Sequence, residues 1–478
     1  MGIKLYNTAI RDKELFKPLN NKKVGMYVCG VTVYDLCHIG HARSAIVFDV
    51  LARYLRARGY ELTYVRNFTD IDDKIINKAK EVGKDTKEIA EYYIKAFYED
   101  MEKLYVERAD YEPRATQFID KMIDMVRILL EKGHAYIADG DVYFSVESFP
   151  EYGALSGRKL EDMIAGKRIK VTDKKRHPMD FVLWKSAKPG EPFWDSPWGP
   201  GRPGWHLECS VMSCHYLGPS FDIHGGGKDL LFPHHENERA QAICAYGGTF
   251  ARYWVHNGFV TVESEKMSKS LGNFITIRDA LQIYHPQVIR LFLLSRHYRS
   301  PIDFSKDAVN SMKSALIKAY RTLEKLEDIL GPAEEVKEIY LREEKSDDFL
   351  GRFVEVMDDD LNTAAAIGLL FEKIKEINKK IEEKKGQWKE ELSKDRAQLL
   401  KAGRILGLFK ESPKQFFKEI YERQLPMDIS EIEKLIKQRQ EARKKKNWKE
   451  ADAIRDKLRQ MGIILEDTPQ GTRWRLEI

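Results

Sequence analysis

The stretch at residues 24–43, VGMYVCGVTVYDLCHIGHAR, decides the fold that we predict for the whole chain. It opens with the apolar run 24–28, whose β-branched and aromatic residues favour a buried strand over a helix. The run ends on Cys29 and Gly30, and after a loop the residues 42–58 repeat apolar side chains at helical spacing. The order of strand, loop and helix predicts an open α/β sheet that binds its ligand at the carboxyl end of this strand.

Two histidines, His38 and His41, stand where this helix is expected to begin. A helix N-terminus presents free N–H groups and positive potential, which suit the phosphates of a nucleotide. Imidazole rings at the same place can donate further hydrogen bonds to those phosphates. A single histidine here would more simply be a surface residue, but the pair in His-Ile-Gly-His favours a nucleotide site.

The overall composition bounds the class of protein. With 478 residues the chain is long enough for about three domains, and 43% hydrophobic content is ample for sizeable cores. The net charge of +5 is weak evidence for an acidic partner. Five cysteines argue against a disulfide framework, and no apolar run is long enough to span a membrane. We therefore expect a cytoplasmic protein that does not associate with membranes.

The rest of the chain completes the α/β unit and then changes in character. Residues 62–65 are expected to form a second strand, parallel to the first, which would bring Thr69 to the same edge of the sheet. Residues 115–200 include a part rich in Lys, Pro and Trp, and we interpret them as an insertion in the nucleotide fold, with one strand expected at 142–146. Beyond residue 305 the pattern is helical, and the composition at 410–428 is typical of a linker. Residues 431–460 carry eleven Lys and Arg against six Asp and Glu, and residues 463–465 and 473–476 are expected to pair as two strands.

Four side chains of metal-ligand type are candidates for one site. His234 and Glu238 are four positions apart on an expected helix, so they project from one face. Cys29 and Cys209 each lie near the end of an expected strand or the start of a helix. Thiolate, imidazole and carboxylate groups are all zinc ligands. A free thiol otherwise packs as a small hydrophobe, as we expect for Cys37, Cys214 and Cys244.

Two further segments suit a polyphosphate. A strand expected at 254–262 runs into the loop at 265–273, which carries Lys266 and Lys269 on either side of a serine. Mobile ammonium groups can stabilise negative charge that develops only in the transition state, although an ordinary solvated loop is the alternative. The strand expected at 221–224 runs into a turn of three glycines, residues 225–227, which would let the backbone approach a ligand closely.

These motifs together resemble a known family. The segments His38-Ile39-Gly40-His41 and Lys266-Met267-Ser268-Lys269-Ser270 are similar to the two signature motifs of the class I aminoacyl-tRNA synthetases, in full and in the right order. The resemblance covers nearly the whole chain, with no departure at the motif positions. The residues that resemble the substrate pocket of the cysteinyl-tRNA synthetases are Cys29, Cys209, His234, Glu238, Trp205 and Thr69.

The resemblance implies an ATP-dependent ligase that activates L-cysteine as cysteinyl-adenylate and transfers it to tRNA(Cys), acting as a cytoplasmic monomer. It implies one Zn²⁺ per chain, held by the four candidate ligands and selecting the substrate thiolate, and Mg²⁺ bound with ATP. It assigns catalysis to His38, His41, Lys266 and Lys269. The contacts that it implies are Gly30, Thr69, Trp205 and His224 for cysteine, and His38, His41, Gly225, Gly227, Asp229, Lys266 and Lys269 for ATP.

The expected fold class is α/β, with a Rossmann-like parallel-sheet nucleotide-binding catalytic domain that carries an insertion, followed by an α-helical bundle and a small C-terminal domain. The roles of the domains are those of the family that the chain resembles. The expected ranges are 1–114 and 201–260 for the two catalytic halves, 115–200 for the connective insertion, 261–310 for the lysine loop and stem-contact region, 311–410 for the helical tRNA-binding bundle and 411–478 for the basic anticodon-binding domain.

Two other functions stay open from the sequence. A cysteine ligase acting on an amino sugar would share the zinc and nucleotide motifs but would need no anticodon-reading domain, so the basic helical region favours the synthetase. A zinc-stabilised RNA-binding protein without catalysis would leave both histidines and both loop lysines idle. Zinc also suits the selection of cysteine. A pocket that recognises shape alone separates substrates by only about 10–200-fold per methylene-sized change. A soft thiolate binds Zn²⁺ in preference to an alcohol, so the ion can separate cysteine from serine.

Overall fold

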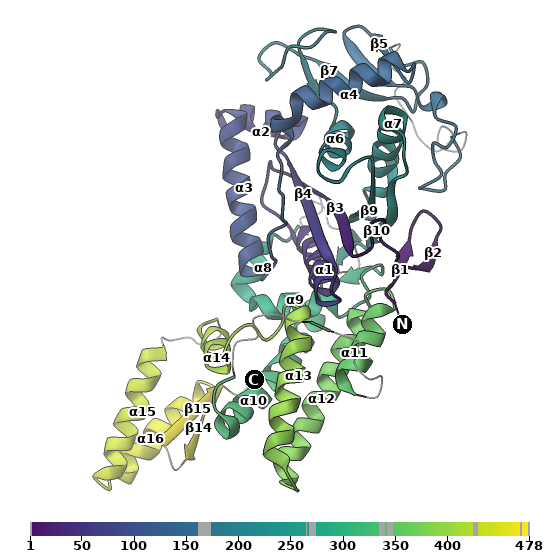
Figure 1. Cartoon of the computed structure of the whole chain (residues 1–478). Helices are drawn as coiled ribbons and strands as arrows, with labels where there is room; N and C mark the ends of the chain where they lie inside the picture. The colour runs from purple at the N-terminus through teal and green to yellow at the C-terminus, as the bar shows by residue number, and fades with distance from the viewer. Residues whose placement is uncertain are drawn as a thin grey trace.

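The computed structural model describes residues 2–160, 174–263, 265–266, 274–333, 340–341, 348–423, 429–468 and 471–476. Figure 1 shows a central sheet with an insertion at one end of the molecule and a helical region at the other. None of the helices in these ranges is long and apolar enough to cross a membrane.

The central sheet is wholly parallel, with the strand order β10-β9-β3-β4. Strand β3 (Lys23–Thr32) lies between β4 (Glu61–Thr69) and β9 (Ser220–Gly227), and β10 (Phe250–Asn257) pairs with β9. The predicted strand–helix–strand unit is confirmed, and each of its two strands is longer than expected. Two parallel strands must be joined by a crossover connection, because the chain has to return to the edge of the sheet where the first strand began. Helix α1 (Ile39–Ala57) is the crossover connection from β3 to β4.

Helices cover both faces of this sheet. Met26 and Tyr27 are adjacent in β3 and therefore point to opposite faces, and they belong to different hydrophobic cores. The core around Met26 includes the apolar side of α1, and the core around Tyr27 includes helix α6 (Trp205–Leu217). Both faces are thus buried, which explains why β3 reads as a continuous apolar run.

The insertion contains an antiparallel sheet that the sequence did not predict beyond one strand. Its order is β5-β6-β7-β8, and it lies over the end of the molecule that carries α6 (Figure 1). Its strands are short and irregular in polarity, so period-two alternation gave little signal. The elements from β4 to α6 are α2 (Asp73–Val82), α3 (Thr86–Lys103), η1 (Ala115–Phe118), α4 (Ile119–Glu131), β5 (Ala135–Ala138), β6 (Asp141–Phe144), η2 (Val146–Ser148), β7 (Phe181–Ser186) and β8 (Gly201–Pro203).

The glycines at 225–227 lie within β9 and do not form the turn that we predicted. A Cβ atom on Gly225 would come within 2.3 Å of the Phe48 ring on α1, so this glycine allows the helix to pack closely on the sheet. The strand predicted at 254–262 is likewise two strands, β10 and β11 (Val260–Val262). They are separated at Gly258, whose backbone N–H donates to the Tyr298 carbonyl at 2.8 Å.

A small three-stranded sheet, β12-β11-β13, follows the catalytic half and leads into helices. The segment at 410–428, which looked like a linker, contains a helix, and its Phe416 ring stacks on Tyr320 at 3.7 Å. The elements are β12 (Glu265–Lys266), α8 (Ile277–Ile283), α9 (Pro286–Leu294), β13 (Ile302–Asp303), α10 (Lys306–Leu330), α11 (Phe349–Asp358), α12 (Thr363–Glu383), α13 (Trp388–Ile405) and α14 (Pro413–Glu422).

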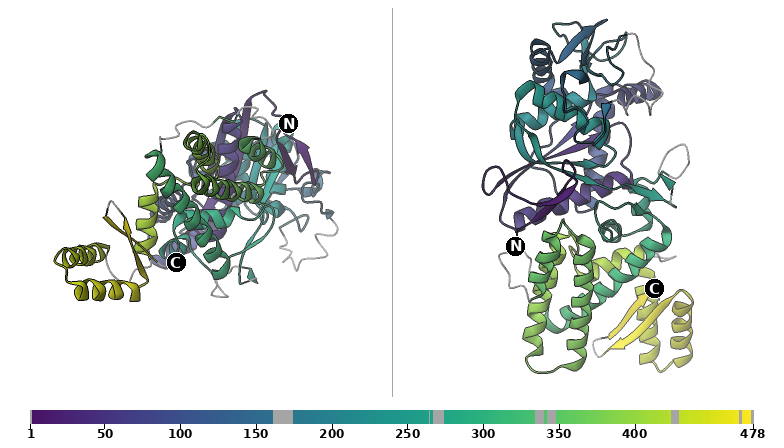
Figure 2. Two further views of the ribbon diagram at one scale, coloured as in Figure 1. Left: turned by 90° about the horizontal axis from the view of Figure 1, so that it is seen from below. Right: turned by 90° about the vertical axis from the view of Figure 1, so that its right-hand side faces the viewer.

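The last residues form a small unit to one side of the helical bundle (Figure 2). The basic stretch is two helices, α15 (Ile429–Lys444) and α16 (Trp448–Gln460), and Lys446 between them has a left-handed backbone. The predicted strand pair is confirmed as β14 (Ile463–Thr468) and β15 (Gly471–Leu476), which are antiparallel. At the other end of the chain, β1 (Lys4–Asn7) and β2 (Asp12–Leu15) form a hairpin that was not predicted.

Candidate active site and metal centre

Four side chains from four different elements meet at the carboxyl end of β3. Cys29 comes from β3, Cys209 from the first turns of α6, His234 from the π-helical turn η3 (Leu231–His235), and Glu238 from helix α7 (Glu236–Tyr246). One ligand atom from each lies within 4.8 Å of the others. These are the four metal ligands that we predicted from the sequence, and the fold brings them together.

The distances within this cluster suit a tetrahedral ion. The Cys29 Sγ atom lies 3.7 Å from Cys209 Sγ and 3.3 Å from Glu238 Oε1, and His234 Nε2 lies 2.9 Å from the same oxygen. Ligands about 2.0–2.3 Å from a zinc ion would be about 3.3–3.8 Å apart, so the sulfur contacts need almost no adjustment. Two thiols, an imidazole and a carboxylate also form a set that zinc accepts.

The cluster is buried and already partly ionised. Burial opposes the charge on Glu238, but His234 and His224 hold the pKa of its carboxyl well below the usual range. Burial raises the pKa of the Cys29 thiol, and the hydrogen bond that it donates to Cys209 raises it further. For Cys209, the contacts from Cys29 and His234 outweigh burial and lower the pKa of the thiol to about 6. One thiolate is therefore available at neutral pH, which is the form that binds a metal.

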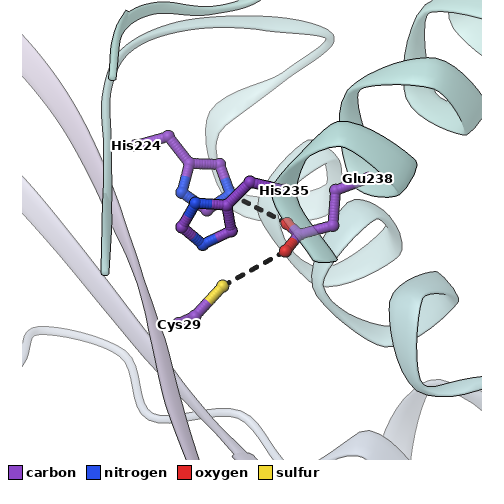
Figure 3. Close-up of side chains that lie close together, drawn as sticks. All are labelled: Cys29, His224, His235 and Glu238. Carbon is purple, nitrogen blue, oxygen red and sulfur yellow. Dashed lines mark hydrogen bonds and ion pairs between the residues drawn. The ribbon is translucent and has the colours of Figure 1, made fainter. Parts of the chain in front are cut away.

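His224 and His235 also lie beside Glu238, on the same side of its carboxylate as Cys29, as Figure 3 shows. His224 Nε2 is 2.8 Å from Glu238 Oε2, so the two oxygens of this carboxylate face different partners. The His224 ring is fully buried and stacks on Trp254 at 4.6 Å. These contacts hold Glu238 in one orientation, and together with Cys29 they form a second possible ligand set, Cys29, His224, His235 and Glu238.

The other residues expected to contact cysteine surround the cluster. Trp205 is half-exposed and stacks on the His234 ring at 4.1 Å. The Gly30 N–H donates to Asn67 Oδ1 at 2.9 Å, and a Cβ on Gly30 would lie 1.6 Å from the Asn67 carbonyl oxygen, so only glycine fits there. Asn67 Oδ1 also lies 3.8 Å from Cys209 Sγ. We predicted no role for Asn67 from the sequence, although Asn67 lies two residues before Thr69 at the end of the same strand.

Thr69 has a hydrogen-bond partner, Glu208, that we did not predict from the sequence. Its hydroxyl donates to Glu208 Oε2 at 2.7 Å. Glu208 is fully buried, and burial raises the pKa of its carboxyl well above the ordinary value. The position of Glu208 directly before Cys209 was the available signal.

His38 and His41 lie where we expected them, at the start of α1. His38 is the N-cap residue, and its Nδ1 accepts a hydrogen bond from the Gly40 N–H at 3.0 Å. The two rings stack at 3.8 Å, and burial together with the charge of His38 lowers the pKa of His41 to about 3. The His41 ring is therefore neutral at physiological pH.

The segment that follows the lysine loop returns to these histidines. The Ile39 N–H donates to the Ile275 carbonyl at 3.2 Å, and the Ile277 N–H donates to the Cys37 carbonyl at 2.8 Å. Lys266 contributes backbone to β12, whereas Lys269 lies outside the described residues. The segment at 275–277, which comes after the second signature motif in the sequence, therefore lies beside the first motif. Of the expected ATP contacts, Gly225 and Gly227 end β9, and Asp229 follows directly.

Comparison with known proteins identifies the family. A model described as the tRNA synthetases class I (C) catalytic domain matches residues 15–314, a DALR domain matches 352–410, and a cysteinyl-tRNA ligase anticodon binding domain matches 429–475. This chain is 50% identical to the cysteine–tRNA ligase of Thermodesulfovibrio yellowstonii and 52% identical to that of Trichlorobacter lovleyi. Each comparison covers 100% of this chain and 100% of the relative. The chain belongs to the cysteine–tRNA ligase family. As a member of the cysteine–tRNA ligases, it is an ATP-dependent aminoacyl-tRNA ligase.

Solved structures show that the fold of this cysteine–tRNA ligase family member is that of class I synthetases. Mycobacterium tuberculosis methionyl-tRNA synthetase, in complex with methionyl-adenylate, aligns with a TM-score of 0.57 at 16% identity, covering 80% of this chain and 89% of the other. An Agrobacterium radiobacter leucyl-tRNA synthetase, solved in a ternary complex, aligns with a TM-score of 0.59 at 12% identity, covering 85% and 86%. The predicted fold class is confirmed.

Proposed function

We propose that the protein is a cysteine–tRNA ligase that activates L-cysteine with ATP, releases pyrophosphate and transfers cysteine from the adenylate to the 3′-terminal ribose of tRNA(Cys). The observation that carries the proposal is the four-residue cluster of Cys29, Cys209, His234 and Glu238, whose ligand atoms lie within 4.8 Å of one another. Its family membership points to the same reaction. A cytoplasmic location, a monomeric state and the domain boundaries given above remain predictions of this proposal.

The cluster would hold one Zn²⁺ next to the amino-acid pocket. When bound, the ion supplies a soft Lewis acid that ionises a thiol and coordinates it in preference to a hydroxyl. Trp205, stacked on His234, and Gly30, packed against Asn67, would border the space for the rest of the substrate. The His224 ring contacts the second oxygen of the Glu238 carboxylate, so its role would be to orient Glu238 as a metal ligand. The direct contact of His224 with cysteine that the resemblance implies stays a prediction beside this role.

The chemistry at the carboxylate needs no general base, because cysteine's carboxylate is already a nucleophile. It attacks the α-phosphate of ATP, and catalysis consists of positioning and of stabilising charge. His38 and His41 would donate hydrogen bonds to the phosphates at the N-terminus of α1. Gly225, Gly227 and Asp229 would contact the adenosine. Lys266 and Lys269 would stabilise the departing pyrophosphate, with Mg²⁺ bound to ATP.

Cysteine-dependent exchange of pyrophosphate into ATP tests the first half of the reaction. Charging of tRNA(Cys) with cysteine tests the second half, and it separates a tRNA ligase from a ligase acting on an amino sugar. Absence of cysteine-dependent exchange from the purified, zinc-loaded protein would refute the proposal.

A Lys269→Ala variant should form the adenylate about 10²–10³-fold more slowly, because one preorganised donor to the transition state is lost. The binding of cysteine should be nearly unchanged, since the charge develops only during the reaction. Single-turnover adenylation measured by rapid quench gives the rate. A rate within a few-fold of the wild type would show that Lys269 does not stabilise the leaving group.

Removing the residues after Arg423 should leave ATP–pyrophosphate exchange within about twofold of the wild type and lower kcat/KM for tRNA charging by about tenfold or more, because the basic α15–α16 pair would bind tRNA phosphates. The cut is placed after α14, since Phe416 packs on Tyr320 in the bundle core. Salt dependence of charging should also weaken in the truncated protein. Charging that is unchanged at moderate salt would exclude this role.

A further inference from the structure

Three side chains of metal-ligand type meet outside the active site, where helix α14 contacts the start of helix α9. His285 directly precedes α9, Glu419 lies in α14, and Glu411 lies in the segment that joins α13 to α14. His285 Nε2 is 3.2 Å from Glu411 Oε2 and 3.3 Å from Glu419 Oε2, and one ligand atom from each residue lies within 4.8 Å of the others. None of the three residues has a part in the proposed reaction.

Hydrogen bonds do not account for this arrangement. A ring N–H that donates to a carboxylate points at the oxygen that accepts it. His285 is almost fully buried, and its Nε2 atom lies near both carboxylates with hydrogen-bond geometry to neither. Both oxygens of Glu411 are likewise buried without a hydrogen-bond partner. An ion placed among the three groups would give each of these atoms a partner.

The cluster also lacks compensating positive charge. Burial lowers the pKa of His285, so its ring is neutral at physiological pH. Burial and the neighbouring Glu419 raise the pKa of Glu411 to about 8. Arg423 lies 3.5 Å from Glu419 Oε2, and in the part of the chain that the structure describes no lysine or arginine forms an ion pair with Glu411. Buried carboxylates are paired or bind metals, so a divalent cation fits what is missing here.

The N-terminus of α9 does not supply this charge. Its dipole favours nearby carboxylates, but it amounts to only a fraction of a charge. The Gln287 N–H donates to His285 Nδ1 at 3.2 Å and is not directed at either carboxylate. A metal at Nε2 would leave the ring proton on Nδ1 and so replace this hydrogen bond, which is at the long end of the usual range.

The ligand types and their spacing favour zinc. Imidazole and carboxylate atoms at about 2.0–2.2 Å from a tetrahedral zinc ion lie about 3.3–3.6 Å apart, close to the two distances from His285 Nε2. Phe416 packs edge-on against the His285 ring at 4.8 Å, and the Gln415 amide donates to Glu419 Oε1 at 2.7 Å, so neighbouring groups orient two of the ligands. The Glu419 side chain is 26% exposed, which gives an ion access from solvent.

We propose that His285, Glu411 and Glu419 form a second metal site, which binds Zn²⁺ and fastens α14 to the start of α9. Three protein ligands leave the fourth position of the ion to water. Helix α14 is the last helix before the C-terminal unit, so the ion would brace the base of that unit. Without a thiolate, the site should bind zinc more weakly than the cluster of Cys29 and Cys209 does.

Cobalt distinguishes the two sites by their spectra. The full chain, with zinc at the cysteine-containing cluster and with weakly held metal removed on a chelating resin, is titrated with Co²⁺. We expect one further ion to bind per chain, with visible d–d bands and no sulfur-to-metal charge-transfer band, and added Zn²⁺ should displace it. His285→Asn, which keeps an acceptor for the Gln287 N–H, and Glu411→Gln should each weaken binding by more than about 100-fold, because partners that only orient a ligand are already worth about 10–100-fold.

Glu422→Gln on the same helix is the matched control, because Glu422 is exposed and belongs to none of the ligand clusters, and it should bind Co²⁺ as the wild type does. Hydrogen exchange gives a second readout: Co²⁺ should slow the exchange of α14 amides in the wild type and not in Glu411→Gln. If His285→Asn does not fold, Glu411→Gln decides. Absence of a second bound ion, or Co²⁺ binding that Glu411→Gln leaves unchanged, would overturn this inference. Neither result depends on the proposed function, which cysteine-dependent exchange tests separately.

Discussion

A Cys209→Ser variant is expected to lose its bound metal and to show kcat/KM for cysteine activation lowered by about 10³-fold. The pKa of about 6 makes the Cys209 thiol an anionic ligand at neutral pH, and serine offers a hydroxyl that ionises far less readily. Losing about 4 kcal/mol of metal-derived stabilisation corresponds to about 10³ in rate. Metal content by atomic emission and ATP–pyrophosphate exchange at varied cysteine measure the two effects.

The matched control is Cys214→Ser on the same helix. Burial raises the pKa of the Cys214 thiol to about 12, so it is a neutral thiol, and it belongs to neither ligand cluster. Its replacement should keep the metal and nearly all activity. The KM for ATP should change little in either variant, because the residues that we propose for ATP binding lie outside α6. A Cys209→Ser protein with full metal content and normal kinetics would exclude Cys209 as a ligand.

The same site could instead hold a structural ion that is closed at four ligands and remote from the substrate. Substitution with Co²⁺ distinguishes the two arrangements. If the substrate thiolate joins the metal, cysteine should raise a sulfur-to-metal charge-transfer band and serine should not. A spectrum that stays the same at saturating cysteine would indicate a structural ion.

The sequence predicted those parts of the fold that depend on local pattern. β3 and α1 follow from short-range periodicity and from the turn between them, and the parallel pairing with β4 follows from their order. Short elements escaped prediction. Strand β13 has two residues, and α14 has ten residues in a segment whose composition is typical of a linker.

The site was predictable in its ligand types and not in its supporting residues. Cys29 and Cys209 are 180 residues apart, so no spacing rule joins them, and the resemblance to a family supplied that link. The positions of Asn67, His224 and Glu208 around the cluster depend on contacts between segments that only the folded chain brings together. No motif connects the three residues with the four ligands along the sequence, which is why one of the three was given a different role and two were given none.

A buried arginine, Arg290, joins three parts of the structure that hold the site in place. It is fully buried in α9, and it forms an ion pair with Asp49 of α1, the helix that begins at the two signature histidines. Its Nε donates to the Leu406 carbonyl at 2.6 Å and its Nη1 to the Leu104 carbonyl at 3.1 Å. Asp49 holds a second cation, Arg53, at 2.9 Å. Helix α9, helix α1 and the segments that end at Leu104 and Leu406 thus meet at one buried charge.

Arg290→Met should lower the free energy of unfolding of the catalytic domain by about 3–5 kcal/mol, because it takes one of two cations from the buried Asp49 carboxylate and leaves the Leu104 and Leu406 carbonyls without their donor. Lys13→Met provides the control, since the Lys13–Asp359 pair at 2.8 Å is largely exposed and should be worth less than about 1 kcal/mol. Urea titration followed by near-ultraviolet circular dichroism measures both variants. In the double variant Asp49→Asn/Arg290→Met the loss should be smaller than the sum of the single losses, because each substitution removes the same pair. Additive losses, or an Arg290→Met protein as stable as Lys13→Met, would show that the Asp49–Arg290 pair does not hold the bundle on the catalytic domain.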